Sequence, residues 1–277
     1  MTGSMASPNQ TRPQQPGSGA SPPATTWKSV AIPTEHGGWS LTAEPALLGL
    51  VVAWSLPGLA LGLAAMVAFV ARTPLKLVLV DRFRHRWLPR TTLAAQIATV
   101  EVAILLVLVG YAVGAGKAFW LPLAVAAPLI IVELWFDMRS RSRRLIPELA
   151  GSMGIGSIAT AIALADGASA TLAWGLWVVI AARSFAAIPY VRTQILRTKS
   201  RPAPRWHSDT AQIGAVAVAA VGWAFGLVPA VVVVVIAILA TVNLVAVRLT
   251  PQRAVVIGIQ QMFVGLAVIF TTALAAA

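Results

Sequence analysis

The sequence contains no cysteine. Disulfide bonds, thiolate chemistry and cysteine-based metal sites are therefore excluded. Charge is scarce as well, because only 11% of the 277 residues are Asp, Glu, Lys or Arg, whereas a soluble domain carries about 25%. Acidic residues are rarer than basic ones, since the chain has nine aspartates and glutamates and 21 lysines and arginines. This composition argues against a soluble domain.

Apolar residues make up 58% of the chain, and the mean hydropathy is +0.80. Runs of roughly twenty apolar residues recur from Trp39 to the C-terminus, and each is long enough to cross a bilayer as a helix. We predict an all-α fold: a polytopic membrane helix bundle with about nine transmembrane helices. The predicted spans are 39–56, 59–80, 92–113, 119–138, 147–165, 170–189, 209–225, 227–248 and 252–275.

Two features complicate this division. Arg72 and Thr73-Pro74 interrupt the second span, which either ends near Ala71 or continues with a kink. Residues 1–28 are rich in Ser, Pro, Gln, Thr and Gly, a composition that buries too little apolar surface to fold. We therefore expect a disordered tail over 1–28 and a transmembrane domain over 29–277.

Seventeen of the 21 lysines and arginines lie in the connections after the second, fourth, sixth and eighth spans. The positive-inside rule then places the N-terminus in the cytoplasm and the C-terminus outside the cell membrane. Anionic lipid head groups match such a basic face. We therefore expect membrane lipids as partners, and no nucleic acid.

Polar residues gather where the first span begins, in Glu35-His36-Gly37-Gly38-Trp39. On a helix, His36, Ser40 and Glu44 form one stripe, and a histidine there is suited to acid/base chemistry or to ligand binding. The alternative is structural: Thr34 caps the helix, Glu35 favours its N-terminus and the glycines allow close packing. The functional interpretation is preferred, because capping requires neither His36 nor Glu44.

A second acidic pair ends the fourth span, where Glu133 and Asp137 are four residues apart and share a helix face. Two such carboxylates suit a divalent cation or a shared proton. The alternative is an ion-paired helix end with the neighbouring arginines as partners, and the spacing favours it.

Pro147-Glu148 is typical of a helix start. The following Gly151-x-x-Gly154-x-Gly156 has the outline of a dinucleotide fingerprint, but it lacks the preceding strand. We interpret these glycines as sites of close helix packing.

Arg183 and Glu101 lie deep inside spans, where charge is costly and usually functional. Arg183 is near Tyr190 and Arg192, and its guanidinium suits either a diphosphate ligand or a buried glutamate. Glu101 lies deep in the third span, where it is protonated, part of a proton route, or paired with Arg183. The structural pair is the interpretation we prefer.

The stretch Pro33-x-Glu35-His36-Gly37-Gly38-Trp39 resembles the opening of the YwiC-like family of bacterial membrane proteins. Weaker matches follow at three places: Arg72-x-Pro74-Leu75, Arg143-Arg144-x-x-x-Glu148-Leu149-x-Gly151, and Arg183-Ser184 with Tyr190-Val191-Arg192. The resemblance covers nearly all of the chain after the tail. It implies membership of a family, and it does not imply a reaction.

A more distant likeness is to the UbiA superfamily of intramembrane prenyltransferases, which implies nine helices around a cavity open to lipid. Those enzymes use Mg²⁺ held by two Asp-rich motifs after the second and sixth helices. Here the two connections hold only Asp81 and Asp209. The cofactor is therefore left unknown, since the sequence does not support Mg²⁺ of the UbiA kind.

The combined prediction is a multi-pass membrane protein that handles a lipid or isoprenoid at a cytoplasmic-side cavity. Glu35, His36 and Glu148 are the candidates for proton transfer or ligand positioning. Residues expected to bind ligand are Trp39, Arg72, Arg183, Tyr190 and Arg192, with Glu133 and Asp137 as metal candidates. The alternative is a transporter or other non-enzymatic membrane protein with ion or proton sites at Glu44 and Glu101.

Overall fold

The computed structural model describes residues 27–33, 36–139 and 144–277. All regular structure in these residues is α-helical, which confirms the predicted fold class. A short α1 (Trp27–Ala31) is followed by nine longer helices that correspond one by one to the predicted spans. These are α2 (His36–Val52), α3 (Leu56–Phe83), α4 (Pro89–Ala115), α5 (Trp120–Met138), α6 (Leu145–Asp166), α7 (Ala170–Thr198), α8 (Trp206–Ala224), α9 (Ala230–Ala246) and α10 (Ala254–Ala276).

Six of the described helices, α3 to α7 and α10, are long and apolar enough to cross a membrane. The apolar parts of α2 and α9 are shorter. Of the two alternatives for the second span, the structure has the longer one, because α3 continues through Pro74 to Phe83. Most of the predicted tail lies outside the described residues. That all nine helices cross the membrane stays a prediction, as does the sidedness of the chain.

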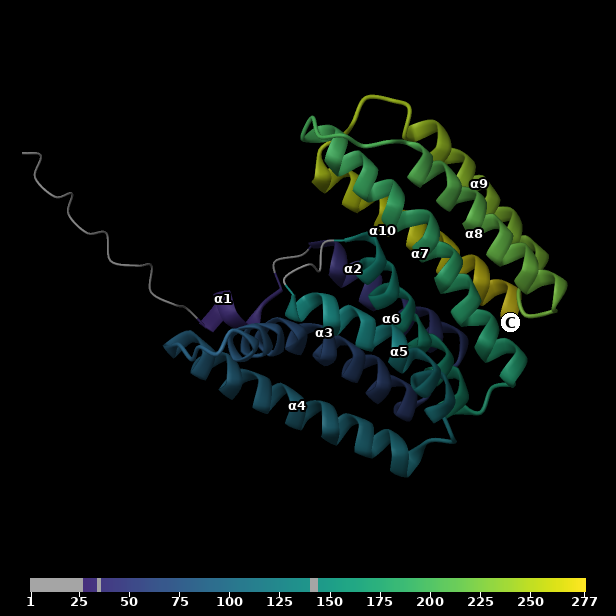
Figure 1. Ribbon diagram of the computed structural model, residues 1–277. Helices are drawn as coiled ribbons and strands as arrows, with labels where there is room; N and C mark the ends of the chain where they lie inside the picture. The colour runs from purple at the N-terminus through teal and green to yellow at the C-terminus, as the bar shows by residue number, and fades with distance from the viewer. Residues whose placement is uncertain (1–26, 34–35, 140–143) are drawn as a thin grey trace, which may run out of the picture.

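The helices form two groups (Figure 1). The first holds α1 to α6, with α3 packed on α4 and α5 packed on α6. The second holds α7 to α10. Each group has its own apolar core: Leu61 and Ile162 are buried in the first, and Val179 and Val232 in the second.

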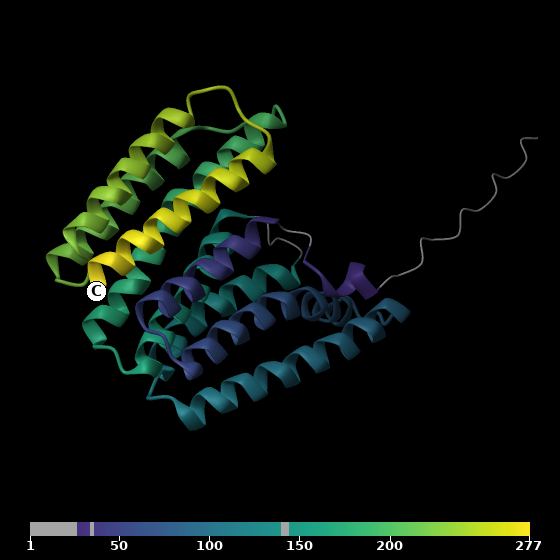
Figure 2. The ribbon, with the colours of Figure 1, turned by 180° about the vertical axis from the view of Figure 1, so that it is seen from behind.

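The groups meet where α6 and α2 of the first contact α7 and α10 of the second. Seen from behind, α10 runs beside α2 (Figure 2). Part of this junction is apolar and includes Leu48, Ala163, Leu176 and Ile269. The rest of the junction is polar.

Successive helices run back and forth, so the start of α2 and the C-terminal ends of α3, α5, α7 and α9 lie at one end of the bundle (Figure 1). We call this the basic end, because it carries the arginine-rich connections predicted from the sequence. Two aspartates organise the helix ends there.

Asp81, in the last turn of α3, is 1% exposed. Its carboxylate accepts hydrogen bonds from Thr91 Oγ1 at 2.7 Å and from Arg86 Nε at 2.7 Å. These bonds join the end of α3 to the start of α4. They also satisfy the buried charge, which would otherwise be costly.

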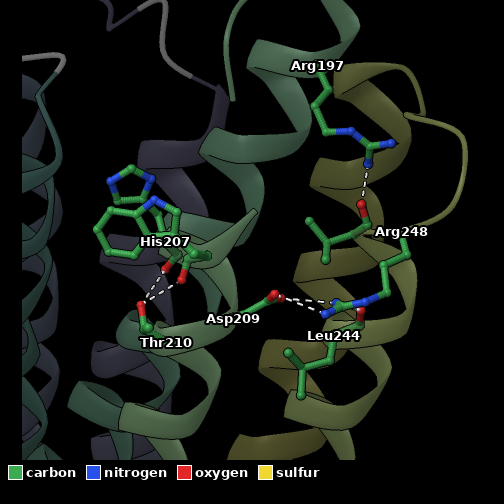
Figure 3. A network of polar contacts seen from close by, with 8 residues as sticks. Arg197, His207, Asp209, Thr210, Leu244 and Arg248 are labelled. Carbon is green, nitrogen blue, oxygen red and sulfur yellow. Dashed lines mark hydrogen bonds and ion pairs between the residues drawn. The ribbon is translucent and has the colours of Figure 1, made fainter. Parts of the chain in front are cut away.

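Asp209 has a more open setting in the first turn of α8 (Figure 3). It accepts two bonds from Arg248, which follows α9, at 3.1 and 3.0 Å. Arg197 of α7 donates to the main-chain oxygen of Leu249 at 2.9 Å. Asp81 and Asp209 are thus both bound to arginine.

We expect Asp81→Ala to lower the free energy of unfolding by about 2–4 kcal/mol, because it leaves buried donors without an acceptor. The matched substitution Asp209→Ala removes an exposed pair and should cost about 1 kcal/mol or less. Chemical unfolding of the purified variants in detergent micelles measures both. Equal losses would contradict the assignment of Asp81 as the anchor of the α3–α4 turn.

Candidate functional site

A buried ionic contact joins the two groups of helices about midway along α7. Arg183 is 4% exposed, and its Nη2 donates to the main-chain oxygen of Gln261 on α10 at 2.7 Å. Nη1 donates to Gln261 Oε1 at 3.1 Å, and Nη2 lies 3.4 Å from Glu44 Oε1 on α2. Ser40 Oγ donates to the same Glu44 oxygen at 2.9 Å. One guanidinium therefore contacts both neighbouring helices.

The depth of this contact makes it costly. Arg183 lies about 20 Å along the axis from either end of α7, at a rise of 1.5 Å per residue. A charge at such a depth in a bilayer needs a partner. Even so, Arg183 Nε is buried and has no hydrogen-bond partner. Nε is thus the one guanidinium nitrogen for which the described residues offer no acceptor.

Gly265 on α10 gives Glu44 its space. A Cβ atom at this glycine would come within 2.3 Å of Glu44 Oε1. Any larger residue would push the carboxylate away from Arg183, or α10 away from α2. The ionic contact and the close approach of the two helices therefore depend on each other.

Two more polar contacts connect α6 and α7 between Arg183 and the basic end. Ser152 Oγ and Ser184 Oγ are 2.8 Å apart and buried. Nearer the helix ends, Arg192 Nη1 donates to Glu148 Oε2 at 3.3 Å, and both side chains are 34% exposed. We call these contacts, with Glu44, Arg183 and Gln261, the polar seam. It occupies the half of the group junction that faces the basic end.

A second ionic cluster lies between α3 and α5. Arg72 contacts Glu133 Oε1 and Asp137 Oδ2, both at 2.9 Å. Lys76 Nζ lies 3.2 Å from Asp137 Oδ1, and Asp137 is 1% exposed. These contacts favour the ion-paired alternative for the two carboxylates, with partners on α3. No group of three or more metal-binding side chains occurs among the described residues.

The glycines of α6 are packing sites. A Cβ at Gly151 would lie 2.4 Å from the Glu133 carboxyl carbon, and one at Gly154 would lie 2.6 Å from Ile130 of α5. Gly156 faces Ile180 and Trp177 of α7 instead. The absence of side chains lets α6 lie close to both neighbours, as its sequence predicts.

The other predicted ligand-binding residues have ordinary packing partners. Trp39 packs edge-on against Phe69 of α3, with ring centroids 5.1 Å apart. Tyr190 is buried, and its hydroxyl accepts a bond from Gln194 Nε2 at 3.4 Å. Glu35 and the side chain of His36 lie outside the described part of the structure, so their predicted roles stay predictions.

One predicted pair is wrong. Arg183 binds Glu44, and Glu101 has a different setting. Glu101 lies on α4, which packs on α3 and has no substantial contact with α7. Its Oε2 is buried without a hydrogen-bond partner in the described chain. Both Arg183 and Glu101 lie deep in predicted spans, so their positions in the sequence make a pair plausible. The helices that carry them do not pack against each other.

Sequence reasoning gave no role to several residues of these clusters: Lys76, Ser184, Gln261 and Gly265. Gln261 carried a usable signal, because it is a polar residue within an apolar span. Gly265 carried none, since its role depends on which side chain of another helix faces it.

Residues 32–163 match the family model described as YwiC-like protein. The match extends from the start of the predicted site through α5 and most of α6, and it confirms the resemblance over this region. Neither the curated proteins nor the solved structures gave a match to the chain. The likeness to UbiA enzymes therefore stays a prediction.

The geometry at Gly265 yields a test with a control on the same helix. We expect Gly265→Ala to lower the free energy of unfolding by about 1–3 kcal/mol, because the added methyl overpacks the Glu44 carboxylate. Gly258→Ala has no atom within 4 Å of the new Cβ and should be neutral or mildly stabilising. Unfolding in detergent measures both, and a neutral Gly265→Ala would contradict the close contact between α2 and α10.

Proposed function

We propose that this multi-pass membrane protein binds a lipid with an anionic head group, isoprenoid or phospholipid, in the polar seam between its two helix groups. Arg183 is the residue that binds the anion. The observation that carries the proposal is the guanidinium itself: 4% exposed, at the group junction, with a buried Nε that has no partner.

The contacts around Arg183 leave capacity for an anionic oxygen. A charge-assisted N–H···O bond is usually 2.7–2.9 Å long, whereas Arg183 Nη2 and Glu44 Oε1 are 3.4 Å apart. The Glu44 contact is therefore longer than a usual charge-assisted bond. An arginine binds phosphate or carboxylate through two parallel donors, and Nε with Nη2 is such a pair. A ligand oxygen at Nε would share the guanidinium with Glu44 or displace it.

The rest of the polar seam supports a route from the basic end. Arg192 and Glu148 are half-exposed at its rim, and the Ser152–Ser184 pair lies between them and Arg183. A polar head group that parts α6 from α7 here exchanges these contacts for its own. Proton transfer or ligand positioning by Glu35, His36 and Glu148 belongs to the same proposal.

A transporter is the second candidate, and Glu44 favours it. Its carboxylate connects the groups through Arg183, so protonation of Glu44 would weaken a contact across the junction and couple a proton to movement of the groups. Glu101 does not extend this route. It lies on the peripheral α4 between lipid-facing residues such as Val100 and Ile104, which are 60% and 46% exposed.

Native mass spectrometry of the purified protein tests the lipid proposal. Arg183→Gln should lower the occupancy of a co-purifying anionic lipid by about tenfold or more, which corresponds to the loss of one charge-assisted contact. Arg183→Lys keeps the charge and should retain an intermediate occupancy, because the paired donors are lost.

The double variant Glu44→Gln/Arg183→Gln controls for folding, because it replaces the buried pair by two neutral amides. Its free energy of unfolding should return toward that of the wild type, while the occupancy of the co-purifying lipid should stay low. Lipid occupancy that follows stability across these variants would contradict the proposal, and so would full occupancy in Arg183→Gln.

The transporter candidate predicts proton flux through proteoliposomes that hold a pH-sensitive dye. Glu44→Gln should reduce the flux to that of empty liposomes, while Glu101→Gln should leave it unchanged. A wild-type protein that dissipates a pH gradient no faster than empty liposomes rules the candidate out.

A further inference from the structure

A basic cleft lies where α3 and α5 end, away from the polar seam. It has a volume of about 390 Å³ and is lined by Phe83, Arg84, Met138 and Arg139. Arg84 follows the last residue of α3, and Arg139 follows the last residue of α5. Two arginines and two apolar residues thus line one opening at the basic end.

Ion pairs hold the two helices that form the cleft. Arg72 and Lys76 of α3 contact Asp137 of α5, one and two residues before the lining residues Met138 and Arg139. The cleft is therefore built on a fixed pair of helices. A ligand that binds there does not have to bring the helices together first.

Two of the four described residues that line the cleft are arginines, and none of the four is acidic. Each helix C-terminus contributes about half a negative charge, and the two ends together offset roughly one of the two guanidinium charges. The carboxylate of Asp137, the residue before Met138, is 1% exposed and already contacts two cations. It therefore does not repel an incoming anion, and the cleft favours a negatively charged ligand.

The apolar lining and the neighbouring tryptophan indicate the source of that anion. Phe83 is 62% exposed. Trp135 is 50% exposed, and the Arg139 guanidinium lies over its ring, 4.1 Å from the centroid. Exposed tryptophans at helix ends lie at the head-group level of a bilayer. A free phosphate would leave Phe83 and Met138 in water, whereas a phospholipid covers them with its acyl chain while its phosphate meets the arginines.

We infer that the cleft between Arg84 and Arg139 is a binding site for the head group of an anionic phospholipid. The two arginines hold the phosphate, and Phe83 with Met138 contacts the first part of the acyl chains. This site is separate from Arg183 and does not depend on the function proposed for the polar seam.

Titration of the detergent-purified full chain with phosphatidylglycerol, followed by native mass spectrometry, tests the inference. The inference gives each of the two arginines a charge-assisted contact with the phosphate, so Arg84→Gln/Arg139→Gln should weaken the first lipid adduct roughly tenfold or more. The control Arg201→Gln/Arg253→Gln removes the same charge from other exposed positions of the basic end. It should change the affinity less than about twofold, because neither residue lines the cleft.

Three outcomes overturn the inference. Equal weakening in the two double variants would mean that the whole basic face attracts the lipid. Binding of zwitterionic phosphatidylcholine as strong as that of phosphatidylglycerol would remove the role of charge. Displacement of the lipid by millimolar inorganic phosphate would identify a site for the free anion.

The same experiment distinguishes the cleft from the site at Arg183. Arg183→Gln should leave the phosphatidylglycerol affinity of the cleft unchanged, while Arg84→Gln/Arg139→Gln should leave the lipid that co-purifies through Arg183 in place. Failure of one proposal therefore leaves the other standing.

Discussion

The buried contact of Arg183 with Gln261 and Glu44 is the constraint on which the arrangement of the two helix groups depends. A guanidinium that is 4% exposed within apolar helices needs partners. It finds them on α2 and α10, one from each group. Breaking a buried pair on one side leaves an uncompensated charge and costs about 3–5 kcal/mol. This contact therefore fixes how α7 lies against α2 and α10 along the polar half of the junction.

Small residues make that constraint possible. Gly265 leaves room for the Glu44 carboxylate, and Gly151 leaves room for Glu133. Without a hydrophobic driving force between helices in lipid, close packing and polar contacts supply the stabilisation. The two ionic clusters combine both effects, because Glu44 and Glu133 each lie against a glycine of a neighbouring helix. The arginine that contacts each of these carboxylates comes from a third helix.

Much of the organisation was predictable because it is periodic or compositional. The nine long helices follow from apolar runs and turn residues, and the packing role of Gly151, Gly154 and Gly156 follows from their lack of side chains. Arg183 stood out because a charge is costly within a span. Its partner did not follow, because Glu44 and Glu101 both lie in spans and only the packing of α2 against α7 distinguishes them.

The sequence by itself determined the fold class, the order of the helices and the end of the bundle that carries the arginines, since each depends on local composition. Only the tertiary structure decided which charges meet: Arg183 with Glu44, Arg72 with Glu133 and Asp137, and Arg192 with Glu148. It also decided that Arg84 and Arg139, 55 positions apart in the chain, line one cleft. Such pairings depend on which helices are neighbours and how each is rotated about its axis. The sequence of a single helix determines neither property.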